Sequence, residues 1–274
     1  MLVLVSCAWR PRARQRSQTR HHERVFNGVD VKNGIYTYVV ILLFMSERTC
    51  TGTLIAAEWV VTAAHCNVDS VQYGNMTSRP HLVTAISQLL KRIPHPNYQH
   101  VRVNDLAMLL VEEICLDRYG ALSAIDYGSM LGLKVLWIGG GLTTWSWNAS
   151  NVIADYMRPL QQGTGALIRC GQYDESIGPH MCVAGPCSSQ QHVMPADSGG
   201  PLFVADKIVG VAYTLHYTRK TSVFTAISPY SNWIAIVMKD NDLCYTLLGK
   251  IGVILCYVIS IISMLANILA FKVG

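Results

Sequence analysis

The sequence has few charged residues and neither internal repeats nor low-complexity tracts. Only 14% of its 274 residues are charged, whereas 51% are hydrophobic. A chain of this length and composition can bury one sizeable core, and all-β folds made of two barrels commonly count as one domain at this size. We therefore expect one large folded domain, with short segments outside it.

Aromatic residues are absent between Arg10 and Arg24, although arginines are concentrated there. Six arginines against a single acidic residue, Glu23, give the first 24 residues a net charge of +5, which equals the charge of the whole chain. Nucleic-acid binding is disfavoured, because the charge is confined to one short segment without interleaved aromatics. We interpret residues 1–24 as a removable leader or propeptide, although Met1 to Trp9 lacks the basic residue that precedes the apolar region of a signal peptide.

Nine cysteines indicate the secretory pathway, since oxidised cysteine frameworks are ordinary there and unusual in the cytosol. The odd count leaves at least one cysteine unpaired. Two Asn-X-Ser/Thr triplets, at Asn75 and Asn148, are glycosylation acceptors if the chain enters that pathway. Cysteines and histidines do not show the spacing of a metal site, so we expect neither a metal nor a cofactor.

Residues 251–271 carry no charge and are flanked by Lys250 and Lys272. At 1.5 Å per residue, a helix of this length crosses a hydrocarbon core of roughly 30 Å. We therefore predict a transmembrane helix here and a juxtamembrane linker at 241–250, with the folded domain extracellular or in the secretory lumen. A buried core helix, a lipid anchor and a secreted protein are the alternatives; the lipid-anchor signal is poor because Leu243 is not small.

The middle of the chain is rich in predicted strands. Between residues 30 and 235 the apolar runs are short, β-branched and separated by turn residues. We predict strands at 36–44, 58–62, 135–138 and 208–213. Residues 231–238 lack the alternation of a strand and follow a Ser-Pro-Tyr turn, so we predict a helix that ends the domain.

Three segments carry a histidine, an aspartate and a serine that together suit peptide-bond hydrolysis. The segment TAAHC at 62–66 places His65 after an apolar strand, where a structural histidine is the alternative. The segment NDLAMLL at 104–110 places Asp105 at the start of a strand, where a carboxylate must be paired or cap a turn. The segment DSGGPL at 197–202 is the most specific, because turn chemistry alone rarely produces a serine in such a glycine-rich turn.

Together these segments resemble the trypsin/chymotrypsin family of serine proteases over roughly residues 24–238. The resemblance includes RVFNG at 24–28, EWVV at 58–61, GGG at 139–141 and the end of the domain at 230–234. It implies an all-β fold of two six-stranded antiparallel β-barrels with a C-terminal helix, and a protease domain at 25–240. It also implies Ser198 as the nucleophile, His65 as the general base, Asp105 as the group that orients His65, and the backbone N–H groups of Ala196 and Ser198 as the oxyanion hole.

The resemblance further implies activation by cleavage after Arg24. The new ammonium of Val25 would enter the core to pair with Asp197, and burying either charge alone would cost several kcal/mol. The uncleaved chain should therefore be inactive.

The family's disulfides fall on two cysteine pairs, Cys50 with Cys66 and Cys170 with Cys182. A bridge between Cys7 and Cys115 is a further hypothesis for tethering the leader. The partners of Cys187, Cys244 and Cys256 stay open.

The chain departs from the family pattern beside the nucleophile. Ala196 replaces an oxyanion-hole glycine and keeps its N–H, but it resists a positive φ at a cost of roughly 1–2 kcal/mol. Met194 replaces a cysteine, and no cysteine between Ser198 and Lys239 remains as its partner. We therefore expect looser walls around the primary specificity pocket.

The specificity pocket itself is unusual. His192 stands at the pocket floor, where trypsin-like members have an aspartate, so a preference for Arg or Lys is not supported. Tyr213 and Thr214 occupy part of a segment that usually reads Ser-Trp-Gly, and the missing glycine should crowd the entrance.

Two functions remain open. The first is a serine endopeptidase with protein or peptide substrates, an activating protease and membrane attachment through 251–271. The second is a non-catalytic homologue that acts as a membrane-tethered binding or regulatory protein, favoured by the departures above. The retained triad and activation junction favour the enzyme.

Overall fold

The structure is a computed structural model that describes residues 25–32, 34–76, 84–99, 103–141, 159–171, 178–216 and 219–241. The chain divides into two compact units, Met1–Tyr230 and Ser231–Gly274. The predicted leader at 1–24 and the predicted transmembrane helix at 251–271 lie outside the described residues, as does all but the first residue of the predicted linker. Within the described ranges, no helix is long and apolar enough to cross a membrane.

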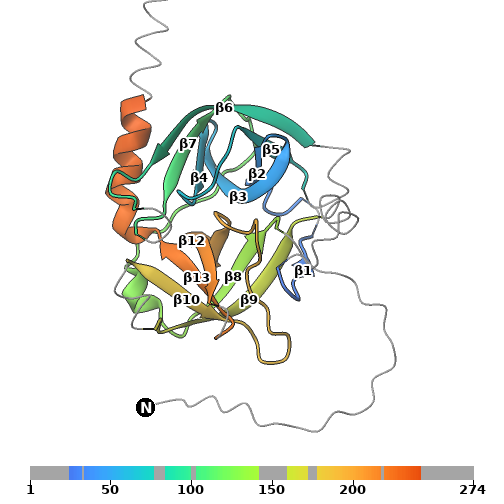
Figure 1. The fold of residues 1–274 in the computed structure, drawn as a ribbon, viewed down its shortest axis with the longest axis vertical. Coiled ribbons are helices and arrows are strands. Elements are labelled where there is room, and N and C mark those ends of the chain that lie inside the picture. The colour runs from blue at the N-terminus through green and yellow to red at the C-terminus, as the bar shows by residue number, and fades with distance from the viewer. Residues whose placement is uncertain are drawn as a thin grey trace, which may run out of the picture. The chain divides into compact units, whose positions relative to one another are not determined.

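Six strands in the first half of the chain form a closed antiparallel barrel with the order β2-β3-β4-β7-β6-β5 (Figure 1). They are β2 (Val39–Phe44), β3 (Glu47–Ala56), β4 (Trp59–Thr62), β5 (Ser70–Gly74), β6 (Thr84–Pro94) and β7 (Ala107–Val111). Every residue of β4 and β7 is buried, as expected for apolar strands inside a closed barrel. Because β4 and β7 are antiparallel and Thr62 pairs with Ala107, the residues after β4 lie beside those before β7.

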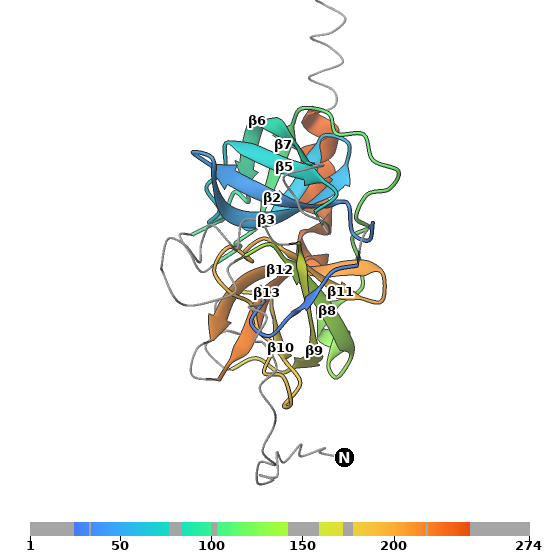
Figure 2. The ribbon, with the colours of Figure 1, turned by 90° about the vertical axis from the view of Figure 1, so that its right-hand side faces the viewer.

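A second closed barrel follows, with the order β9-β10-β13-β12-β11-β8 and a β8–β9 pairing that closes it (Figure 2). Its strands are β8 (Lys134–Gly139), β9 (Gln161–Ile168), β10 (His180–Ala184), β11 (Pro201–Val204), β12 (Lys207–His216) and β13 (Thr221–Ala226). The short strand β1 (Val29–Asp30) pairs with β9. Trp137 and Phe224 meet in the core of this barrel, with ring centroids 6.3 Å apart.

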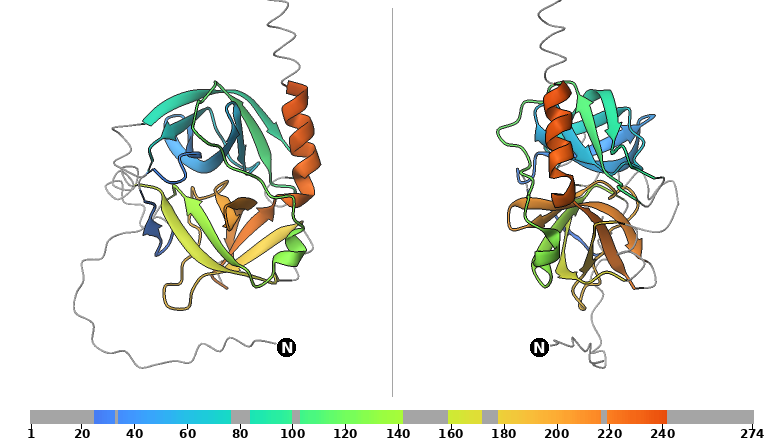
Figure 3. Two further views of the ribbon diagram at one scale, coloured as in Figure 1. Left: turned by 180° about the vertical axis from the view of Figure 1, so that it is seen from behind. Right: turned by 90° about the vertical axis from the view of Figure 1, so that its left-hand side faces the viewer.

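Among the described residues, the 3-10 helices are η2 (Tyr127–Met130) and η3 (Ser228–Tyr230). Residues 231–241 form an α-helix, drawn in orange in Figure 3. The predicted fold of two six-stranded barrels and a terminal helix is therefore confirmed. The four predicted strands correspond to β2, β4, β8 and β12, of which β2 begins three residues later than predicted and β12 ends three residues later.

The structure contains the two disulfides that the resemblance implied, Cys50–Cys66 and Cys170–Cys182. Cys115 and Cys187 are exposed free thiols among the described residues, and the hypothetical bridge from Cys115 to Cys7 stays a prediction. Cys7, Cys244 and Cys256 lie outside the described residues.

Candidate active site

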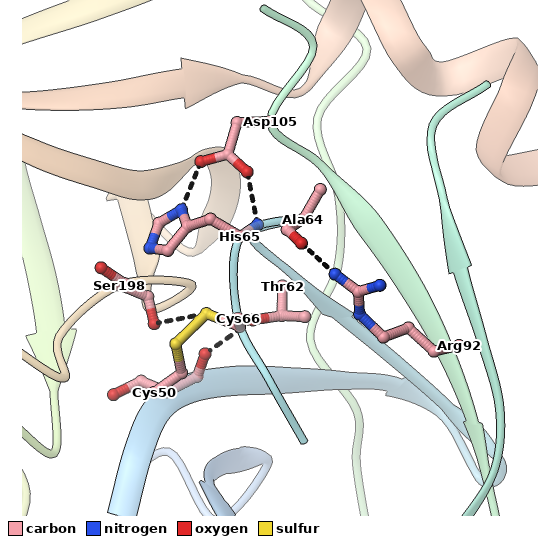
Figure 4. Close-up of polar contacts among 9 residues, drawn as sticks. Cys50, Thr62, Ala64, His65, Cys66, Arg92, Asp105 and Ser198 are labelled. Carbon is pink, nitrogen blue, oxygen red and sulfur yellow. Dashed lines mark hydrogen bonds and ion pairs between the residues drawn. A yellow bond between two sulfur atoms is a disulfide. The ribbon is translucent and has the colours of Figure 1, made fainter. Parts of the chain in front are cut away.

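His65 and Asp105 are brought together by the pairing of β4 with β7. Asp105 Oδ2 lies 2.6 Å from His65 Nδ1, and Asp105 Oδ1 accepts the backbone N–H of His65 at 2.8 Å (Figure 4). The Asp105 side chain is fully buried, whereas 26% of the His65 side chain is exposed. The carboxylate thus fixes both the ring and the backbone of the histidine, and one edge of the ring remains open to solvent.

This contact decides which ring nitrogen carries the proton. A carboxylate only accepts hydrogen bonds, so Nδ1 of His65 donates and Nε2 is left as the acceptor. Figure 4 shows Ser198 on the Nε2 side of the His65 ring. Ser198 and His65 line the same cleft, which has a volume of about 630 Å³. Ser198 therefore shares a cleft with a histidine whose Nε2 is the proton-accepting nitrogen.

The loop that carries Ser198 has two consequential backbone conformations. Gly199 has φ +83°, and a Cβ there would collide with Thr62 Oγ1, so only glycine fits. Ala196 has φ +68°, in the left-handed region that alanine adopts at a cost of roughly 1–2 kcal/mol. The positive φ considered for Ala196 from its sequence position is therefore present in the structure.

Thr51 of β3 holds this loop through two hydrogen bonds and connects it to Gly140 through a third. Its hydroxyl donates to the carbonyl oxygen of Ala196 at 2.9 Å and accepts the N–H of Gly140 at 3.1 Å. Its backbone N–H donates to the carbonyl oxygen of Ser198 at 2.8 Å. Sequence reasoning missed Thr51, because a buried threonine in a strand carries no signal of a contact 145 residues away.

Asp197, the predicted partner of the new N-terminus, is 1% exposed. Its carboxylate accepts the backbone N–H of Gly141 at 2.9 Å and that of Met194 at 2.7 Å. Val25 is fully buried in the hydrophobic core cluster of the second barrel, whereas Arg24 lies outside the described residues. The chain that follows the predicted cleavage site is thus anchored in the barrel that carries Asp197.

His192, predicted at the floor of the specificity pocket, stacks on the ring of Phe26. The two ring centroids are 4.5 Å apart and the ring planes differ by 1°. Nδ1 of His192 donates to the carbonyl oxygen of Val193 at 3.1 Å. Burial of the ring lowers the pKa of His192 below its ordinary value, and the positive charge of Lys220 lowers it further.

A hollow of about 100 Å³ lies beside Ser198 and is lined by residues 193–195 and 212–215. Tyr213 and Thr214, both predicted for the specificity pocket, belong to this lining. His192 is not among the described residues that line it, because its ring is occupied by Phe26. The Tyr213 ring also meets the His65 ring edge-on, with centroids 6.4 Å apart.

Two further residues of the cleft were not found from the sequence. The guanidinium of Arg92 donates to the carbonyl oxygen of Ala64, next to His65, and lines the cleft together with Tyr98 (Figure 4). An exposed arginine in a strand has no local pattern that distinguishes it from a solubilising residue.

The sulfurs of Cys50 and Cys66 lie close to the ring of His65. Since they are joined in a disulfide, they are not thiolates and cannot bind a metal with His65. Of the two glycosylation acceptors, Asn75 is half-buried after β5 and Asn148 lies outside the described residues. Glycosylation of either asparagine stays a prediction.

Comparisons with known proteins give one consistent result. The family model described as Trypsin matches residues 25–234. The chain is 28% identical to mast cell protease 2 of Ovis aries over 233 residues, covering 79% of this chain and 92% of that protein. It is 30% identical to the chymase of Mus musculus over 203 residues, covering 70% and 80%. The solved structure of neuropsin, described as a serine protease expressed in the limbic system of mouse brain, has the same fold, with a TM-score of 0.66, 19% identity, and coverage of 78% of this chain and 100% of that one.

Proposed function

The chain belongs to the trypsin family of serine proteases, and from this premise we propose that it is a serine endopeptidase. The observation that carries the proposal is the 2.6 Å contact between His65 Nδ1 and Asp105 Oδ2 in the cleft that Ser198 also lines. A binding module has no chemical need for a buried carboxylate that leaves Nε2 of a partly exposed histidine free to accept a proton.

In the proposed mechanism, Ser198 Oγ attacks the carbonyl carbon of the scissile peptide bond while His65 Nε2 takes the hydroxyl proton. The imidazolium that forms is stabilised by Asp105. His65 then gives the proton to the leaving amine, the C–N bond breaks, and an acyl ester remains on Ser198. Water, activated by the same histidine, hydrolyses the ester and restores the serine.

We propose the backbone N–H groups of Ala196 and Ser198 as the donors to the oxyanion. Loss of one such donor lowers the rate by a factor on the order of 10² to 10³. The alanine keeps its N–H, and its positive φ costs much less than loss of the donor. We therefore expect the substitution to slow the reaction rather than abolish it.

We propose activation by cleavage after Arg24, followed by pairing of the Val25 ammonium with the Asp197 carboxylate. Burial of both Val25 and Asp197 supports this pairing, because an ammonium released at the buried Val25 would be strongly disfavoured without a carboxylate. An Arg24→Gln protein should show no activity until Val25 is exposed by other means. Equal activity of this variant and the wild type would refute the scheme.

We propose that residues 251–271 anchor the protein in a membrane, with a secreted protease as the alternative. In a detergent phase separation, the full chain should enter the detergent phase and a chain that ends at Lys250 should stay in the aqueous phase. If both partition into the aqueous phase, the anchor is refuted and the secreted alternative is favoured.

The test of the catalytic proposal is covalent labelling of Ser198. The full chain would carry the recognition sequence of a site-specific protease in place of residues 20–24, so that one cut exposes Val25. A fluorophosphonate should label the cleaved protein and not the matched Ser198→Ala variant. If the folded, correctly cleaved protein is not labelled more than the Ser198→Ala variant, a non-catalytic homologue is favoured. The departures at Ala196 and Met194 support this second function.

A further inference from the structure

We infer that the hollow beside Ser198 accepts a small aliphatic side chain, such as that of alanine or valine, from the substrate residue before the scissile bond. The inference rests on the proposed endopeptidase function and deepens it. The hollow measures about 100 Å³, whereas an apolar cavity of roughly 150 Å³ accommodates benzene. The ring of a phenylalanine therefore exceeds the space that this hollow offers.

Leu215 belongs to the lining of the hollow. It is half-buried and packs against the core cluster of the second barrel, to which the lining residue Val193 also belongs. Both side chains make the lining apolar, and that of Leu215 takes up space that a smaller residue would leave open.

Ser222 is not among the described residues that line the hollow, but it supports two of them. It is fully buried, and it lies opposite Leu215 in the ladder between β12 and β13. Its Oγ accepts the backbone N–H of Val193 at 3.0 Å. The hydroxyl therefore connects the lining segments of Val193 and Leu215 and holds the hollow at its present size.

The uncharged lining of the hollow excludes substrates with a charged side chain before the scissile bond. None of the described residues that line the hollow, at 193–195, 198 and 212–215, is charged. The ammonium of lysine or the guanidinium of arginine would be buried there without a partner, which is strongly unfavourable. An acidic side chain finds no cation either, because the ring of His192 is stacked on Phe26 outside the lining.

The experiment compares peptide nitroanilides of the form Suc-Ala-Ala-Pro-X-p-nitroanilide, with X as Ala, Val, Phe, Arg or Asp. The enzyme is the full chain after cleavage to expose Val25, and its active sites are counted by fluorophosphonate labelling. We expect kcat/KM for Ala and Val to exceed that for Phe, Arg and Asp by at least about tenfold. Preference for Phe, Arg or Asp would overturn the inference, and so would labelled enzyme that does not cleave the Ala and Val substrates.

Two variants test the residues that set the size of the hollow. Leu215→Gly should enlarge the hollow by removing a lining side chain, and Ser222→Gly should enlarge it by releasing the lining residue Val193. Each should raise the ratio of kcat/KM for Phe to that for Val by at least about fivefold, whereas the matched control Leu131→Gly, at an exposed leucine, should not. The ratio does not depend on the amount of folded enzyme. An unchanged ratio in labelled Leu215→Gly and Ser222→Gly enzymes would overturn the assignment, whereas absence of labelling in the wild type would refute the proposed function instead.

Discussion

Replacing Thr51 with valine should slow the proposed reaction although Thr51 does not line the cleft. The threonine hydroxyl donates to the carbonyl oxygen of Ala196, the residue in the left-handed backbone conformation. Valine has nearly the same shape and lacks the hydroxyl, so the change removes this hydrogen bond together with the one that the hydroxyl accepts from the N–H of Gly140, and it leaves the core packing of β3 in place.

The expected magnitude follows from two opposing free energies. The left-handed conformation of Ala196 costs roughly 1–2 kcal/mol, and one hydrogen bond contributes roughly 0.5–1.5 kcal/mol. Without the bond, the strain favours rotation of the Ala196 peptide away from the oxyanion. A change of about 1 kcal/mol in this equilibrium corresponds to a roughly fivefold fall in kcat. KM should change little, since neither Thr51 nor Ala196 is among the described residues that line the cleft or the hollow.

The assay is a comparison of kcat between Thr51 and Thr51→Val enzymes in two backgrounds. In the wild-type background we expect the fivefold fall, and Thr51→Ser, which keeps the hydroxyl, should restore most of the rate. In the Ala196→Gly background the same change should lower kcat less than about twofold, because glycine adopts a positive φ without strain. Fluorophosphonate labelling corrects every value for the fraction of active enzyme.

The outcome that refutes this reasoning is an equal fall in both backgrounds. Such a result would mean that Thr51 stabilises the fold in general and does not compensate for the conformation of Ala196. An unchanged kcat in the wild-type background would refute any role of the hydroxyl.

Three further perturbations test other contacts of the site. Burial holds the pKa of His192 below the usual value of about 6.5, so this histidine takes up a proton at a higher pH in the unfolded chain than in the folded protein. The wild-type Tm should therefore decrease more between pH 7.5 and 5 than the Tm of His192→Gln. Equal decreases would contradict the argument. Removing the Cys50–Cys66 disulfide by alanine at both positions should lower the free energy of unfolding by about 3 kcal/mol, measured by urea denaturation. The Tyr230 hydroxyl donates to Asn104 Oδ1 at 2.9 Å, so Tyr230→Phe should cost about 1 kcal/mol in the same assay, and no loss would mean that solvent replaces the bond.

The positions of His65 and Asp105 relative to their strands could be read from the sequence because the signals are local. An apolar run precedes one residue and follows the other, and both runs are wholly buried strands. The register that places Thr62 opposite Ala107, and thereby brings the two side chains together, depends on packing in the whole barrel. The sequence alone does not contain that register in any local pattern.

The orientation of His192 could not be predicted for the same reason. Its distance along the chain from Ser198 suggested the floor of a pocket, but its ring lies against Phe26, which is remote in sequence. Thr51 and Ser222 were missed because a threonine or serine in a strand is equally consistent with a solvent-facing position. Their contacts with Ala196 and Val193 arise only when separate strands and loops meet.

The two departures from the family pattern are Ala196 in the oxyanion loop and Met194 at the hollow. They differ in how well the hydrogen bond of a neighbouring hydroxyl can compensate for them. At the oxyanion loop, the Thr51 bond contributes about 1 kcal/mol against a backbone cost of the same order, so the loop can keep its conformation. At the hollow, the Ser222 bond to Val193 also contributes about 1 kcal/mol, whereas a disulfide typically contributes roughly 2–4 kcal/mol. The walls next to Met194 are therefore less firmly connected than the oxyanion loop. We accordingly expect the departures to affect discrimination between side chains of similar size more than the rate of the chemical step, which favours an enzyme with modest selectivity over a protein that has lost its chemistry.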